Sequence, residues 1–333
     1  MSVSLAEPRP SSSSRRLAED DGELQQDADF WFADGSIVLI AENATFRVHQ
    51  GVLSRHSEVF RELFTVPQPH DEQSVYGCPV VRLYDSPIDL RYLLRVLYDG
   101  RKHSVKHEPR LEFSEVEAVV RLAHKYELNE LREEGVQRIM AVFTDDFTVY
   151  SRSDEVGRPR LFLRPSDAIS VVKLAHLTQE LTLLPLALYD CARLSATQLM
   201  EGVSLANGTI DRLSQEDLAR CIDGKSVLAH KRAMVILGTF VKGSHERVHS
   251  LQCATNLRVL LLSLTDKLPM GCHPLKCLRD YIDKSCEWGK LCDKCRQVMH
   301  AKHLESRREI WRDLPSYFGL DDWDKLRTAG ASA

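Results

Sequence analysis

The chain has 333 residues, of which 43% are hydrophobic and 28% charged, and its formal net charge is -4. This length allows two domains, or one domain with a large extension, and either can bury a substantial core. The small net charge gives no global reason to expect nucleic acid or an anionic membrane as partner. No apolar run approaches the roughly 18 residues of a membrane span. The first residues lack the apolar centre of a signal peptide.

Cysteine usage points to a reducing compartment, the cytoplasm or the nucleus. The chain has nine cysteines, an odd number, and no sign of secretion. We therefore expect thiols or metal ligands rather than a disulfide framework.

Residues 1–26 contain prolines, a serine run at 11–14 and an acidic cluster, with almost nothing to bury. Such composition is typical of a disordered tail, which we predict here.

Residues 29–64 are predicted to form a β-hairpin followed by two short helices. An apolar run at 36–41, a polar turn, and alternating residues at 45–49 indicate the hairpin. Apolar pairs then recur at helical intervals from Val52, and Ser57 is the expected N-cap of the second helix.

A third strand is predicted at 80–84, followed by three helices. In the first of these, Ser86 can cap, Pro87 suits the first helical position and Asp89 favours the N-terminal dipole. Further helices are expected at 114–126 and 129–143.

The order and spacing of these segments resemble the BTB (POZ) domain, in particular its large fungal branch, over about a third of the chain. The residues that carry the resemblance are Asp29, Phe46, His49, Val52, Leu53, Ser57, Phe60, Leu63 and Phe64. The resemblance implies an α+β fold over residues 27–145, in which a short sheet is flanked by helices.

Two departures from the family pattern concern binding. Gln50 stands where many members carry Lys or Arg after the histidine, which argues against a charged pocket there. Many BTB homodimers exchange an apolar N-terminal segment, and residues 1–26 offer no convincing version of it.

Residues 146–165 are predicted to be a polar linker, and residues 166–330 an all-α region. Helices are expected after Ser166, over 183–200 and over 225–241, with a capping-box-like opening at Ser214. The Gly-Lys-Ser sequence at 224–226 is not a phosphate-binding loop, because Ala219 stands where the motif needs glycine.

The Cys-rich segment 272–295 holds five of the nine cysteines. Cys292 and Cys295 have the C-x-x-C spacing that lets two thiolates bind one Zn²⁺. We predict Cys286 as the third ligand, with Cys253, Cys272, Cys277 or a histidine as the fourth. Free thiols are the alternative interpretation.

The last part of the chain combines a basic helix with an aromatic ending. The basic helix at 297–312 is expected to be solvent-exposed, with binding of an acidic or phosphate-bearing partner as the alternative. The segment 311–323 is too aromatic for a disordered tail, so it should pack on the helical region.

The first function hypothesis is a non-catalytic protein–protein interaction module. By family resemblance its partner is a cullin-type ubiquitin ligase, for which the chain would be a substrate adaptor, or another BTB chain. The alternative is a zinc-containing nuclear or transcriptional regulator that oligomerises through the BTB domain, although the pI near 6.4 does not favour nucleic acid. The sequence shows no catalytic arrangement that supports an enzyme.

Overall fold

The computed structural model describes residues 24–65, 77–99, 111–156, 161–205, 207–240, 251–265 and 271–330. The chain forms two compact units, Met1–Leu94 and Arg95–Ala333. The predicted tail lies outside the described residues up to position 23, and its last two residues begin a strand. The boundary between the units falls inside a helix, well before the predicted domain end at 145.

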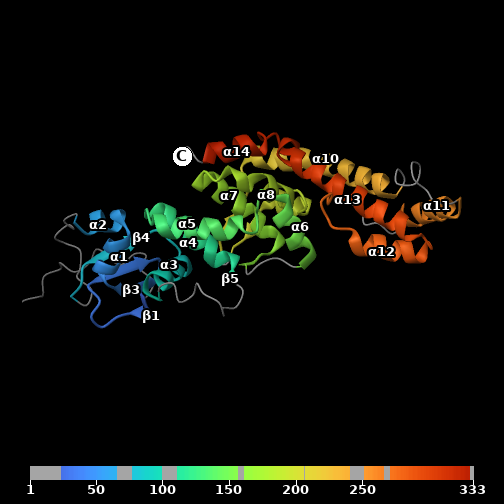
Figure 1. Cartoon of the computed structure of the whole chain (residues 1–333). Helices are drawn as coiled ribbons and strands as arrows, with labels where there is room; N and C mark the ends of the chain where they lie inside the picture. Colours follow the sequence, from blue (N-terminus) through green and yellow to red (C-terminus); the bar gives the residue numbers. More distant parts are fainter. Residues whose placement is uncertain are drawn as a thin grey trace, which may run out of the picture. The chain divides into compact units, whose positions relative to one another are not determined.

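The first unit is built on a four-stranded sheet (Figure 1). Its strands are β1 (Gln25–Trp31), β2 (Ile37–Ala41), β3 (Ala44–Val48) and β4 (Val80–Leu83), in the spatial order β1-β3-β2-β4. The antiparallel pairing of β2 with β3, from Ile37 opposite Val48 to Ala41 opposite Ala44, confirms the predicted hairpin. All five residues of β2 are buried, as expected for a central strand covered on both faces.

Strand β1 was not predicted, because its residues carry no alternating apolar pattern. It pairs parallel with β3, and its register shifts between Gln26 and Trp31. Asp27 lies in that interval, where its Oδ1 accepts hydrogen bonds from the backbone N–H groups of Asp29 and Phe30. Its Oδ2 accepts two more from the Arg91 guanidinium, at 2.8 and 2.6 Å. A buried carboxylate therefore fixes both the irregular strand and its attachment to a helix.

Three helices accompany the sheet: α1 (Gln50–His56), α2 (Glu58–Thr65) and α3 (Pro87–Asp99), the last of which crosses the boundary between the units. The predicted N-caps are confirmed at two of them. Ser57 Oγ accepts from the Phe60 N–H at 3.0 Å, and Ser86 Oγ accepts from the Ile88 N–H at 3.3 Å.

The second unit begins with a helix pair, α4 (Phe113–Lys125) and α5 (Asn129–Met140). These helices pack so closely that a Cβ at Gly135 would lie 2.3 Å from Val120 Cγ2. The predicted linker 146–165 contains a helix, α6 (Phe147–Val156), and a short strand, β6 (Leu161–Phe162), which pairs with β5 (Leu111–Glu112). The linker prediction missed the helix because Thr148 and Arg152 are exposed, while Phe147 and Tyr150 pack on the core.

The all-α prediction for the rest of the chain is confirmed, apart from a small hairpin of β7 (Val203–Ser204) and β8 (Ile210–Asp211). The helices after β6 are α7 (Ala168–Thr178), α8 (Leu184–Cys191), α9 (Ala196–Glu201), α10 (Gln215–Phe240), α11 (Leu251–Thr265), α12 (Arg279–Trp288), α13 (Asp293–Asp313) and α14 (Trp323–Gly330). Helices α10 and α13 run side by side (Figure 1). The helix predicted over 183–200 is interrupted, because Ser195 starts α9 with a capping box.

The main core of this unit gathers apolar residues from α4 to the C-terminal segment. Trp311 and Trp323 belong to it and their rings stack at 5.5 Å, which confirms that the aromatic ending packs on the helical region. A smaller apolar cluster lies among α10, α11, α12 and α13, and includes Phe240, Ile282 and Met299.

The 271–278 loop is held by side chains of three helices. On α8, Tyr189 OH lies 3.2 Å from His273 Nδ1 and accepts from the Leu275 N–H. On α10, Arg232 donates to the His273 carbonyl. On α13, Arg307 Nε donates to the Leu275 carbonyl at 2.8 Å. These contacts fix an irregular segment whose backbone groups have no helix or strand partner.

The basic helix predicted as solvent-exposed is therefore partly a core element. Arg307 is 1% exposed and His303 is 3% exposed. His303 Nε2 accepts from the Leu278 N–H at 3.0 Å, so this nitrogen is unprotonated. Burial, and then the charges of Arg307 and Arg232, lower the pKa of His303 to about 3.

Within the described residues, no helix has both the length and the apolar character that crossing a membrane requires.

Candidate functional site

The motif histidine, His49, lies where β3 gives way to α1. Its backbone is extended at the N-cap position, and Ser36 Oγ accepts from the Gln50 N–H at 2.9 Å. The imidazole Nε2 lies 3.3 Å from Asp34 Oδ1, and the ring packs on Phe32 at 5.2 Å. Backbone hydrogen bonding and the His49 side chain lower the pKa of Asp34. These contacts join the turn before β2 to the start of α1, so Gln50 and His49 organise the local backbone.

Most of the other motif residues are structural. Phe46, Leu53, Ser57 and Phe60 are buried, Val52, Leu63 and Phe64 are half-buried, and Asp29 is exposed on β1. Phe60 and Phe64 stack at 5.8 Å. The predicted interaction residues thus mainly build the core of the sheet unit.

The exposed edge strand β4 offers a surface that the motif analysis missed. Its side chains alternate, with Val81 and Leu83 buried and Arg82 exposed, and Tyr84 directly after it is 100% exposed. The alternation of residues 81–84 in the sequence predicts that Arg82 and Tyr84 share one face of the strand, opposite to Val81 and Leu83. Among the described strands, β4 pairs only with β2, which places it at one end of the strand order.

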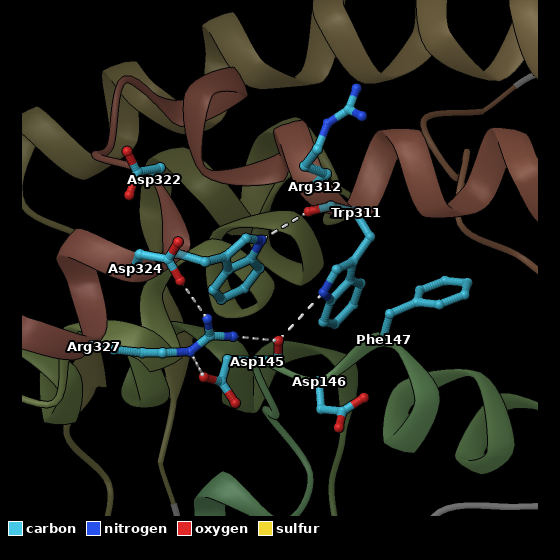
Figure 2. A pocket seen from close by; sticks show the side chains of 9 residues that line it. Asp145, Asp146, Phe147, Trp311, Arg312, Asp322, Asp324 and Arg327 are labelled. Atoms are coloured by element: carbon cyan, nitrogen blue, oxygen red, sulfur yellow. Dashed lines mark hydrogen bonds and ion pairs between the residues drawn. The ribbon is translucent and has the colours of Figure 1, made fainter.

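A pocket of about 590 Å³ lies in the helical unit, where the start of α6 meets the C-terminal segment (Figure 2). Its lining residues are Asp145, Asp146, Phe147, Trp311, Arg312, Asp322, Trp323, Asp324 and Arg327. Four carboxylates beside two tryptophans are a composition that could attract a cation.

The polar groups of this pocket are already used within the protein. Arg327 donates to Asp145 Oδ2 at 2.5 Å and to Asp324 Oδ1 at 2.9 Å, as Figure 2 shows. Asp146 accepts from backbone N–H groups at the start of α6, and Asp322 does the same at the start of α14. We therefore interpret the pocket as the place where the C-terminal segment is attached to the start of α6, rather than as a ligand site.

Three cysteines come together at the other end of the helical unit. The sulfur atoms of Cys253, Cys292 and Cys295 lie within 4.8 Å of one another. Cys286, predicted as a ligand, lies outside this group, where its Sγ donates to Met299 Sδ at 3.9 Å. Burial raises the pKa of the Cys286 thiol to about 11. Cys286 belongs to the small apolar cluster, a placement that cysteine spacing alone does not reveal.

The two other cysteines considered as ligands, Cys272 and Cys277, are not part of the group either. Cys272 is buried and donates to the Ala192 carbonyl at 3.3 Å.

The Gly-Lys-Ser sequence lies inside α10, which agrees with its rejection as a phosphate-binding loop. A Cβ at Gly224 would lie 2.4 Å from Phe318 Cε1. Glycine is needed at this position for packing, because it leaves room for the aromatic ring. The neighbouring Lys225 donates to the Leu194 carbonyl at 2.8 Å.

Comparison with known proteins agrees with the fold. No curated protein matches the chain. Residues 32–140, which run from before β2 to the end of α5, match the sequence pattern of the BTB/POZ domain. The match is to the domain as a whole and does not single out its fungal branch. Such a domain is a protein-interaction module and is generally non-catalytic. Residues 32–140 therefore form a BTB/POZ domain, in which a short sheet is flanked by helices, and a helical region follows it.

Proposed function

We propose that the chain is a non-catalytic adaptor that joins two proteins. The BTB/POZ domain binds a cullin-type ubiquitin ligase scaffold, as the family resemblance implies, and the helical region binds the protein to be modified. The observation that carries this proposal is the terminal position of β4 among the described strands of the sheet, next to the fully exposed Tyr84, within the region that matches the domain.

The β4 edge has the chemistry of a protein-binding surface. An edge strand presents backbone N–H and C=O groups that a partner can pair with. Tyr84 and Arg82 both face solvent, and tyrosine and arginine are enriched among the residues that dominate binding energy at interfaces. A fully exposed aromatic ring also gains the most from being covered.

The test is direct binding between the purified full-length chain and the N-terminal domains of the cullins of its source organism. We expect co-elution with at least one of them. Tyr84→Ala should weaken that binding roughly tenfold or more, as for an interface residue of this type. Trp288→Ala is the matched control, because it removes an exposed aromatic ring from the other compact unit.

Two results would contradict the proposal. One is the absence of co-elution with every cullin tried, using protein whose circular dichroism shows it to be folded. The other is equal binding by wild type and Tyr84→Ala, which would move the interface away from β4.

The alternative function is a zinc-containing nuclear or transcriptional regulator that oligomerises through the BTB/POZ domain. The three-cysteine group favours the zinc part of this alternative. Light scattering would then give a multiple of the chain mass, and the protein would bind DNA with an affinity that falls as salt rises. A monomeric chain that binds no DNA at low salt would contradict this alternative function.

We expect the protein to act in the cytoplasm, the nucleus or both. The nine cysteines support this proposal, because none forms a disulfide. Imaging of the tagged chain in its native cell would test it, and a secreted protein would contradict it.

A further inference from the structure

Three thiols meet where the N-termini of two helices approach each other. Cys253 is the third residue of α11. Cys292 is the N-cap of α13, and Cys295 lies in its first turn. Their sulfur atoms lie within 4.8 Å of one another, and Cys253 and Cys292 are 39 positions apart in sequence. The group is thus created by folding, and it joins segments that are remote along the chain.

The dimensions and chemistry of the group fit a tetrahedral thiolate metal site. Zn–S bonds of about 2.3 Å at tetrahedral angles place the sulfurs about 3.8 Å apart, inside the observed limit. Two cysteines separated by two residues at a helix start are a common way to supply two of the ligands.

We infer that Cys253, Cys292 and Cys295 bind one Zn²⁺ ion, which cross-links α11 to the start of α13. Among the residues that the structure describes, these three form the one group with metal-ligand spacing. Among the described residues the group supplies three ligands, and a fourth ligand completes the tetrahedron. As the ion binds, the thiols lose their protons to solvent and the sulfurs form bonds to zinc.

A structural role follows from the small size of the neighbouring core. Among the described residues, the apolar cluster among α10–α13 has seven buried members, and α11 supplies two of them, Leu257 and Leu260. Few buried apolar side chains therefore anchor α11 among those that the structure describes. A metal cross-link would add to these contacts, because it would hold α11 and α13 together directly.

Zinc suits this site better than other thiophilic ions. The ligands are all thiolates, which exclude Mg²⁺ and Ca²⁺ by softness. A closed-shell ion without redox chemistry matches a site whose role is to hold two helices together. Elemental analysis of the purified chain separates zinc from copper(I), because it identifies the bound metal directly.

The first measurement is the metal content of the full-length chain, purified with a reductant and without chelators. We expect about one zinc per chain by elemental analysis. Replacing zinc by Co²⁺ should produce thiolate-to-cobalt charge-transfer absorption and the intense visible bands of tetrahedral cobalt. The cobalt spectrum uses the wild-type chain, so it stands even where a cysteine variant fails to fold.

The second measurement uses single substitutions. Cys253→Ser, Cys292→Ser and Cys295→Ser should each lower zinc retention after dialysis at least tenfold. Cys286→Ala and Cys277→Ser are the controls, since both cysteines lie in the same unit and outside the group. Both controls should retain zinc and give the cobalt spectrum.

Three results would overturn the inference. They are folded, reduced protein that contains no zinc and gives no cobalt spectrum, loss of zinc in the two controls as well, and a disulfide within the group in freshly purified protein. The site lies outside the region 32–140 that matches the BTB/POZ domain. Its failure would therefore leave cullin binding and the effect of Tyr84→Ala unchanged.

Discussion

The sheet of the first unit and the 271–278 loop of the second are fixed by different interactions. Strand β2 contributes five consecutive buried residues and pairs with a strand on each side. The loop instead gives its backbone groups to Tyr189, Arg232, His303 and Arg307, which come from three helices. The sheet is held by apolar burial and a regular ladder, whereas the loop is held by buried polar side chains.

This difference has consequences for how each region responds to change. An apolar core loses stability in proportion to the volume removed and is insensitive to pH. The four polar side chains that hold the 271–278 loop form what we call the clamp. Its stability depends on each donor and acceptor, because an unsatisfied buried group costs more than the hydrogen bond contributes. The clamp also depends on the protonation state of its histidine.

The largest expected effect is in the sheet unit. Phe60→Ala removes a fully buried ring, with 0% exposure, and should lower the free energy of unfolding by about 4 kcal/mol. Chemical denaturation measures the loss, and hydrogen exchange should show it at residues 24–94.

Phe64→Ala is the control, because this neighbouring ring is only half-buried. It should cost no more than about 2 kcal/mol. Equal losses for the two variants would mean that exposure does not set the cost in this region.

The next effect concerns the clamp. Arg307→Ala leaves the Leu275 carbonyl without this donor and removes a side chain that is 1% exposed. We expect a loss of about 3 kcal/mol, with faster hydrogen exchange in the 271–278 loop. Arg307→Met restores most of the volume without the donor and so separates packing from hydrogen bonding.

Arg308→Ala is the matched control, since this adjacent arginine is exposed. It should change stability by no more than about 0.5 kcal/mol. If Arg307→Met were as stable as wild type, packing rather than the hydrogen bond would hold the loop.

The smallest effect is a pH dependence of the helical unit. The pKa of His303 is about 3 in the folded chain, against an ordinary value of 6.5. Below pH 6.5 the unfolded chain therefore binds a proton that the folded chain does not. The stability from neutral His303 is complete above pH 6.5 and is lost progressively toward pH 3. The loss is about 2 kcal/mol at pH 5.

Denaturation at pH 7 and pH 5 would measure this term, by comparison of wild type with His303→Gln. The variant should lose less stability on acidification than wild type does. His230→Gln, at an exposed position, should behave like wild type. An unchanged pH dependence in His303→Gln would show that another group titrates.

The sheet unit and its helix starts were predictable because their signals are local. The hairpin at 37–48 follows from apolar patterning, and Ser57 and Ser86 act as caps as their positions indicate. Strand β1 was missed because its pairing depends on Asp27, whose partner Arg91 is 64 residues away. Similarly, the burial of Arg307 depends on contacts with residues 275 and 151.

The candidate sites show the same limit. The C-x-x-C spacing of Cys292 and Cys295 indicated two members of the cysteine group, since both lie at one helix start. Choosing between Cys253 and Cys286 as the nearer partner required the fold, because sequence proximity favours Cys286 and the packing of α12 on α13 directs it into the apolar cluster. The exposure of Tyr84 could have been predicted from the alternation of apolar and polar residues in β4, although no motif marks this tyrosine.

The ion pair between Asp27 and Arg91 affects how a shorter fragment should be designed. The match to the BTB/POZ domain starts at residue 32, and a fragment cut there would lack β1 together with this carboxylate. Arg91 would keep its charge beside the sheet without that partner, and β3 would gain an open edge prone to pairing with other copies. Fragments for binding studies should therefore begin before Gln25, and apparent self-association of shorter ones would reflect the truncation.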